Sequence, residues 1–335
     1  MRITPRRLVR QALTCASPER VPRHLWLLPW AAERYPARSA AIQAEYPDDI
    51  VTADPFLRVP LPVSGERYRA GTYIDEWGCL FENVQGGVIG QVKRPLLEDW
   101  SRADRIRPPA ERLTVGTGEV NAFCRSTDRF VLSGCWPRPF ERLQFIRGTE
   151  NLFFDLMERP AGFDLLLGRI HEFYLREYEV WAGTEVDALT LMDDWGTQDS
   201  MLIAPDLWRA LFKPLYRDYV EIAHRAGKYF FMHSDGYILD ILPDLIEIGV
   251  DAINCQVFCM GPELLGDRFR GQITFWGEPD RQRLLPEGTR ADVFEAVRRM
   301  RESLCAGGGV IAMCEFGLAA NPDNVEAYFD AWLDS

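Results

Sequence analysis

The sequence predicts a (β/α)8 barrel, and three observations carry this prediction. The chain has 335 residues, of which 47% are apolar, and a chain of this size can bury a large core. From about residue 185 to the end, short apolar runs alternate with helical patterns in five successive β/α units, as in a parallel sheet covered by helices. Three further strand candidates lie upstream, and three plus five gives the strand count of this barrel.

The first half of the chain contains the less regular elements. Thr4 and Pro5 predict the N-cap and first residue of an opening helix. The three upstream strands are expected at residues 24–28, 49–53 and 130–134. Residues 67–94 do not fit the β/α rhythm, because residues 73–77 and 88–92 flank a turn-rich stretch. We therefore expect a β-hairpin inserted near the barrel mouth.

The second half repeats one pattern. Pro214 should kink the helix expected over residues 205–226, and Thr289 with Asp292 resembles a capping box at the start of a later helix. The five strands are expected at residues 188–192, 229–232, 250–254, 273–276 and 310–313. A doubly wound open sheet is the alternative, but such a sheet usually carries a Gly-rich phosphate turn, which the sequence lacks. We expect one domain over residues 1–335.

Charge and cysteine content exclude several classes of protein. The net charge is −12, which repels phosphate backbones and anionic lipids and makes nucleic acid an improbable partner. No stretch approaches the roughly 20 apolar residues of a membrane helix. Eight cysteines without a Cys-x-x-Cys pair indicate free thiols in a reducing cytoplasm rather than a disulfide scaffold. The sequence therefore predicts a cytoplasmic protein.

Polar residues gather at the ends of the predicted strands, where the active sites of such barrels lie. His233 and Asp235 are two residues apart on an extended segment and share one face, and Cys314 can lean toward them from the end of the last strand. A neutral imidazole, a carboxylate and a thiolate carry a charge of −2, which neutralises a divalent zinc ion. A strand-end His can equally be structural, and a Cys after an apolar strand can equally belong to the core.

Three further carboxylates are candidates for the same site. Asp194, in the pair Asp193-Asp194, can act as a general base or orient a ligand, although an acid of this pair can also stabilise a helix N-terminus. Glu278, beside Trp276, is a candidate fourth ligand or a carboxyl tuned by its apolar neighbour. Glu76 would enter from the inserted hairpin. The other histidines, and Cys255 and Cys259, we interpret as structural.

Several short motifs follow one another along the chain. They are Arg20-Val21-Pro22, Asp75-Glu76-Trp77-Gly78, Asp194-Trp195-Gly196, the stretch 243–249 with Asp251, and Phe275-Trp276-Gly277. In these motifs the chain resembles the uroporphyrinogen decarboxylase superfamily, over nearly its whole length. The resemblance implies a (β/α)8 barrel and one of two activities: decarboxylation of a tetrapyrrole, or methyl transfer linked to cobalamin, as in methylcobalamin:coenzyme M methyltransferases.

The two branches differ in residues that this sequence allows us to compare. True decarboxylases carry an Arg-Gln-Ala-Gly-Arg stretch near the N-terminus, and the corresponding residues 27–35 lack it. The expected mouth also suits a polyanionic porphyrinogen poorly. Against the single Arg281 it contains Glu76, Asp193, Asp194, Asp235, Glu278, Asp280 and Glu315.

The methyltransferase branch binds zinc with His-x-Cys and a distant second Cys. This chain matches with His233 and Cys314 but has Asp235 at the middle position, which makes the site harder and admits other divalent metals. The resemblance implies methyl transfer between a small thiol or methoxylated compound and a corrinoid such as methylcobalamin. Because no Asp-x-His-x-x-Gly motif occurs, a separate partner protein would carry the corrinoid. The alternatives are a decarboxylase of a tetrapyrrole or other carboxylated ring, and a non-catalytic ligand-binding barrel.

Overall fold

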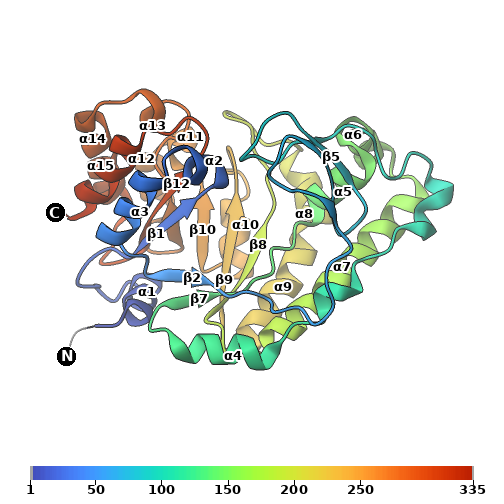
Figure 1. The fold of residues 1–335 in the computed structure, drawn as a ribbon, viewed down its shortest axis with the longest axis horizontal. Coiled ribbons are helices and arrows are strands. Elements are labelled where there is room, and N and C mark those ends of the chain that lie inside the picture. Colours follow the sequence, from blue (N-terminus) through green and yellow to red (C-terminus); the bar gives the residue numbers. More distant parts are fainter. Residues whose placement is uncertain (1–2, 334–335) are drawn as a thin grey trace.

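The computed structural model describes residues 3–333 and contains a nearly closed barrel of eight parallel strands (Figure 1). The strands are β1 (Arg23–Leu27), β2 (Ile50–Thr52), β7 (Phe130–Leu132), β8 (Ala188–Met192), β9 (Tyr229–Ser234), β10 (Ala252–Cys255), β11 (Thr274–Gly277) and β12 (Val310–Phe316). From β2 to β12 each strand pairs in parallel with the next barrel strand along the chain, and β12 pairs with β1, whereas β1 and β2 share no ladder. This is the strand order of the predicted (β/α)8 fold.

The barrel closes between β1 and β2 through carboxylates rather than a ladder. The backbone N–H of Arg23 donates to Asp49 Oδ2 (2.8 Å), and that of Leu25 donates to Asp48 Oδ1 (2.7 Å). Arg20 forms an ion pair with the buried Asp49 at 2.7 Å. The Arg20-Val21-Pro22 stretch therefore belongs to the closure of the barrel and not to the mouth.

Side chains of the barrel strands alternate between two environments, as the period of a strand dictates. The outward set packs against the helices in the larger core cluster, and Val9 of α1 (Pro5–Leu13) joins the inward set. Position along a strand thus decides which strand-end side chains reach the mouth. The inward set consists of Ile50, Phe130, Leu132, Ala188, Phe231, Ala252, Trp276, Ile311 and Met313.

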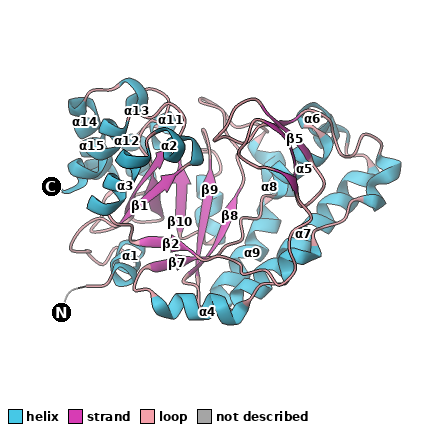
Figure 2. Cartoon of the chain, in the orientation of Figure 1, coloured by secondary structure: helices cyan, strands magenta, loops and turns pink. Residues whose placement is uncertain are grey.

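Helices cover the outside of the barrel (Figure 2). Thr4 caps α1, and Thr289 with Asp292 forms the predicted capping box. The helix expected over 205–226 is broken at Phe212, two residues before Pro214, into α8 and α9. The remaining helices are α2 (Pro29–Arg34), α3 (Pro36–Glu45), α4 (Thr117–Ser126), α5 (Pro139–Arg147), α6 (Thr149–Glu158), α7 (Ala161–Ala182), α8 (Pro205–Leu211), α9 (Lys213–Arg225), α10 (Leu242–Ile248), α11 (Val257–Met260), α12 (Pro262–Phe269), α13 (Leu284–Glu287), α14 (Arg290–Leu304) and α15 (Pro322–Leu333), with short 3₁₀ helices at Trp100–Arg105 (η1) and Ala110–Leu113 (η2).

The inserted segment is an antiparallel sheet of four short strands near α5 and α6 (Figure 1). Its strands are β3 (Ser64–Gly65), β4 (Gly71–Ile74), β5 (Leu80–Asn83) and β6 (Gln91–Val92). The location agrees with the prediction, but the predicted strand bounds were wrong. Asp75 Oδ1 accepts hydrogen bonds from the N–H groups of Trp77 (3.0 Å) and Cys79 (2.8 Å), so the chain turns at Asp75 and β4 pairs with β5.

The helices can also be compared with those that cross membranes. Within residues 3–333, none of the helices combines the length and the apolar character that a bilayer-spanning helix requires.

Candidate metal centre and the adjoining cavity

Three side chains converge at the barrel mouth from the ends of two neighbouring strands. Asp194 follows β8, His233 lies on β9, and Asp235 follows β9. One ligand atom from each lies within 4.8 Å of the others. His233 Nε2 is 3.4 Å from Asp194 Oδ1 and 3.6 Å from Asp235 Oδ1. The prediction placed His233 and Asp235 together, and the structure adds Asp194 as their third member.

A hydrogen bond orients the His233 ring. Asn254 on β10 donates through Nδ2 to the backbone carbonyl of Trp276 at 2.5 Å, so its Oδ1 faces His233 Nδ1, also at 2.5 Å. Nδ1 therefore carries the proton, and Nε2 points toward the two carboxylates. An outer partner that fixes the tautomer in this way is typical of metal-binding histidines. The Trp26 ring, 5.3 Å from the His233 ring, completes the inner wall.

The carboxylates change the acidity of His233. Burial alone would lower its pKa, but the hydrogen bond to Asp194 and the charges of Asp235 and Asp194 outweigh burial and raise the pKa to about 10. Burial likewise opposes ionisation of Asp194, but the bond to His233 and its charge lower the Asp194 pKa to about 2. Without a metal, the group holds a proton between two anions.

The two aspartates of the Asp193-Asp194 pair have separate roles. Asp193 is fully buried and accepts hydrogen bonds from the backbone N–H groups of Phe140 and Glu141 (both 2.9 Å) at the start of α5. It also accepts a bond from the Tyr216 hydroxyl at 2.6 Å. Asp193 is therefore a helix N-terminal acid, whereas Asp194 faces the mouth.

The structure does not bring Cys314 to this group, which corrects the expectation that it is a ligand. Residues 310–313 were expected to form the last strand, but β12 continues to Phe316, so its alternation still holds at Cys314. Met313 lies in the inward cluster, while Cys314 lies in the outward one near Tyr328 of α15. Burial raises the pKa of this thiol well above its ordinary value, which suits a core residue.

Glu278 lies beside the group without being one of its three members. It is 1% exposed, and its oxygens accept no hydrogen bond from residues 3–333, although Oε1 lies 3.0 Å from Arg281 Nε. Burial raises the pKa of Glu278 to about 8 despite the charge of Arg281. Arg281 also contacts Asp235, and it contacts Glu315 at 2.7 Å. Burial therefore shifts the Glu278 carboxyl toward its protonated form, and the contact with Arg281 opposes this shift.

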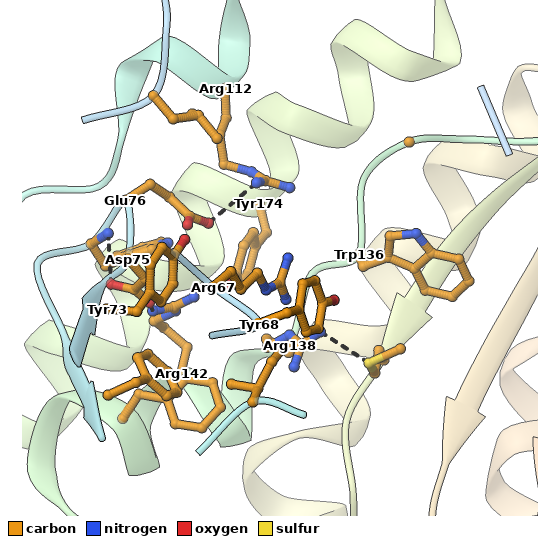
Figure 3. A pocket seen from close by; sticks show the side chains of 17 residues that line it. Arg67, Tyr68, Tyr73, Asp75, Glu76, Arg112, Trp136, Arg138, Arg142 and Tyr174 are labelled. Carbon is orange, nitrogen blue, oxygen red and sulfur yellow. Dashed lines mark hydrogen bonds and ion pairs between the residues drawn. The ribbon is translucent and has the colours of Figure 1, made fainter. Parts of the chain in front are cut away.

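Glu76 lies outside the group, in the wall of a separate cavity of about 430 Å³ (Figure 3). It forms an ion pair with Arg112 at 3.2 Å. Burial opposes its ionisation, but Arg142 and Arg112 lower its pKa. The cavity contradicts the expectation of a uniformly acidic mouth, because four arginines and two acids line it. These are Arg67, Arg112, Arg138 and Arg142, with Asp75 and Glu76.

Arg138 and Glu141 join the cavity to the group, and the sequence alone did not indicate either. Arg138 Nη2 is 2.9 Å from Met192 Sδ, and Met192 pairs with His233 across β8 and β9. Burial and the charge of Asp194 together raise the pKa of Glu141 to about 7, although the charge of Arg138 opposes them. Both residues follow β7 in the stretch 136–142, so their place after a barrel strand was the signal that could have revealed them.

The Asp194–His233–Asp235 group fits a divalent metal. Metal bonds of about 2.0–2.2 Å in a tetrahedron hold ligand atoms roughly 3.3–3.6 Å apart, and the distances of 3.4 and 3.6 Å from Nε2 agree with this. One neutral imidazole and two carboxylates sum to −2 and balance a divalent ion. Two oxygens and one nitrogen form a harder donor set than thiolates, so zinc, manganese and iron(II) all suit it.

The parallel barrel and the residues at its mouth define a (β/α)8 protein whose candidate site lies at the carboxyl ends of the strands. A family model described as "Uroporphyrinogen decarboxylase (URO-D)" matches residues 72–333. The chain therefore belongs to the uroporphyrinogen decarboxylase family, whose members are enzymes.

Comparison with solved structures shows the same fold. A methyltransferase from Methanosarcina mazei is similar with a TM-score of 0.67 and 13% identity, over 99% of each chain. A 3-keto-D-glucoside 4-epimerase from E. coli gives a TM-score of 0.39 and 15% identity over 65% of this chain and 82% of its own. A search of curated proteins finds no match. At these identities the first comparison shows the fold alone, and the second adds nothing to it.

Proposed function

We propose that the chain is a metal-dependent methyltransferase that moves a methyl group between a small molecule and a corrinoid carried by a separate protein. The small molecule is a thiol or a methoxylated compound. The observation that carries the proposal is the Asp194–His233–Asp235 group at the mouth of a barrel of this family. The likeness of the whole chain to a methyltransferase fold supports it.

Each residue of the site has a defined task in this proposal. Asp194 and Asp235 supply negative charge, and Asn254 holds His233 with Nε2 toward them. A bound divalent ion would act as a Lewis acid on the sulfur or oxygen of the small molecule. Burial raises the pKa of Glu278 to about 8, so its protonated form would be available to protonate the oxygen that leaves when a methoxy group loses its methyl. This favours the methoxylated substrate.

The second candidate, a decarboxylase acting on a carboxylated ring, gains one specific observation. The four arginines around the cavity provide the positive field that the acidic mouth lacks. The N-terminal arginine motif of true decarboxylases is still missing from residues 27–35. The Asp194–His233–Asp235 group has no evident task in decarboxylation. We therefore place the decarboxylase second.

Metal content and turnover test the proposal together. The full chain should bind about one equivalent of a divalent ion and exchange methyl groups with added corrinoid, in a screen of thiols and methoxylated compounds. His233→Ala should lose both. His224→Ala is the matched control, because His224 also pairs with a carboxylate, Asp251, at 2.9 Å, outside the Asp194–His233–Asp235 group.

Three results would contradict the proposal in different ways. Less than a tenth of an equivalent of any divalent ion in the wild-type chain would remove the metal. Release of carbon dioxide from uroporphyrinogen, unchanged in His233→Ala, would favour the decarboxylase. Ligand binding that survives His233→Ala, with no turnover in any assay, would indicate a non-catalytic barrel.

A further inference from the structure

The cavity beside the metal group has walls from both the inserted sheet and the barrel. Tyr68 and Tyr73 come from the inserted segment, Trp136 and Arg138 follow β7, and Tyr174 lies on α7. Its volume of about 430 Å³ is within the range of small-molecule pockets. The aromatic walls suit a flat or apolar ligand body.

Two of the four arginines are already neutralised. Arg142 is buried and pairs with Asp75, and Arg112 is 2.8 Å from Glu177 and 3.2 Å from Glu76. These ion pairs stabilise the cavity walls. Removing one partner of a buried pair would leave an uncompensated charge and destabilise the fold.

The other two arginines keep free hydrogen-bonding capacity. Within residues 3–333, Arg67 forms no ion pair, and its guanidinium lies 5.5 Å from the Tyr68 ring. Its loop is held to the sheet, since Asn83 Nδ2 donates to the Arg67 carbonyl at 2.9 Å. Arg138 contacts Glu141 at 3.3 Å through Nη1 and Met192 Sδ at 2.9 Å through Nη2, and each of these nitrogens carries a second hydrogen. In Figure 3, Arg67 and Arg138 point into the space between Glu76 and Trp136.

Arg138 also lies close to the metal group. Its charge contributes to the lowered pKa of Asp194, and the Trp136 ring beside it is 6.0 Å from Trp26, which in turn lies 5.3 Å from His233. A ligand held at Arg138 can therefore extend along this aromatic wall toward His233.

We propose that the cavity binds the anionic group of a small organic acid, a carboxylate or sulfonate, between Arg67 and Arg138. Guanidinium groups bind such groups with two parallel hydrogen bonds. The assignment of this acid as the substrate rests on the proposed function. The proposal that the cavity binds an anion does not depend on the proposed function.

Matched pairs of probes test the proposal on the metal-free full chain. Para-methoxybenzoate is compared with para-methoxybenzamide, and mercaptoacetate with mercaptoacetamide, by calorimetry. Each acid should bind the wild-type chain at least ~tenfold more tightly than its neutral amide. Arg67→Gln should abolish this difference, while Arg67→Lys should restore part of it because charge returns without the planar fork.

The control variant is Arg69→Gln, from the same loop but outside the cavity wall, and it should behave as wild type. His233→Ala should keep the preference for the acids while losing metal, so failure here and failure of the methyltransferase proposal are distinguishable. Equal affinity for acid and amide, no binding of either acid at millimolar concentration, or an equal loss in Arg69→Gln and Arg67→Gln would overturn the proposal.

Discussion

The metal group and the arginine-lined cavity are neighbours with opposite charge. Asp194 and Asp235 face His233, and Arg281 contacts the carboxyl groups of Asp235, Glu278 and Glu315. In the cavity, four arginines face two acids. The net charge of −12 describes neither region. This difference in charge is what our two proposals rest on: the first region would bind a cation and the second an anion.

Removal of both carboxylates from the metal group should have the largest effect. In Asp194→Asn/Asp235→Asn the donor charge is lost, so we expect metal affinity to fall at least ~1000-fold. Titration of the metal-free chain with Zn²⁺ measures this. Binding of para-methoxybenzoate to the same variant should change by less than ~threefold. A parallel loss of both ligands would show that the two regions are one site.

Loss of Asn254, which holds His233 by a hydrogen bond, should have an intermediate effect on metal affinity. Asn254→Ala removes the oxygen that orients His233, and such partners typically contribute 10–100-fold in metal affinity. The same Zn²⁺ titration tests this, with thermal unfolding as the check that the variant is folded. An unchanged metal affinity would mean that the Trp26 wall alone positions the ring.

The acidity of His233 predicts a pH dependence of metal binding. Its pKa is raised to about 10, so a metal must displace a proton at neutral pH. Affinity should rise ~tenfold per pH unit up to about pH 10, with release of one proton. Calorimetry in buffers of different ionisation enthalpy measures that proton. Anion binding by Arg67 should stay constant over this range, because arginine does not titrate there.

The same raised pKa has an opposite effect on stability without metal. The stabilisation from protonated His233 is complete below its ordinary pKa of 6.5 and disappears as pH rises through about 10. The free energy of unfolding of the metal-free chain should therefore fall between these values. His233→Ala should lose this dependence.

The smallest expected effect is that of Cys314→Ala. Because Cys314 lies on the outward side of β12, metal content should be unchanged and the free energy of unfolding should fall by about 1 kcal/mol from the lost packing. Metal analysis and denaturant unfolding check both values. Loss of metal in this variant would restore Cys314 to the ligand set.

The sequence predicted the barrel and part of the site, for physical reasons that differ by residue. Five apolar runs separated by helical patterns were sufficient to predict the barrel. Pro214 was sufficient to predict the break near Phe212 between α8 and α9. His233 and Asp235 were found because they share one strand end. The prediction of Cys314 as a metal ligand was wrong because the predicted strand ended three residues before the end of β12. The alternation along β12 continues through Cys314 and turns its side chain outward.

The arginines of the cavity could not be predicted in the same way. Arg138 and Arg142 lie at the start of α5, but Arg67 lies between β3 and β4 and Arg112 lies in η2. Only tertiary packing brings these three parts of the chain together. The bounds of the inserted sheet were wrong because a side-chain bond of Asp75 decides where the chain turns, and hydrophobic patterns do not record such bonds.

The inserted sheet has a consequence for how the ligand preference of this chain can change. Its four strands pair only with one another, and none of the eight barrel strands pairs with them. Mutations in the loop that carries Arg67 and Tyr68 can therefore accumulate without disturbing the eight barrel strands or the residues around His233. A laboratory selection for altered ligand preference in this chain should therefore randomise this loop first.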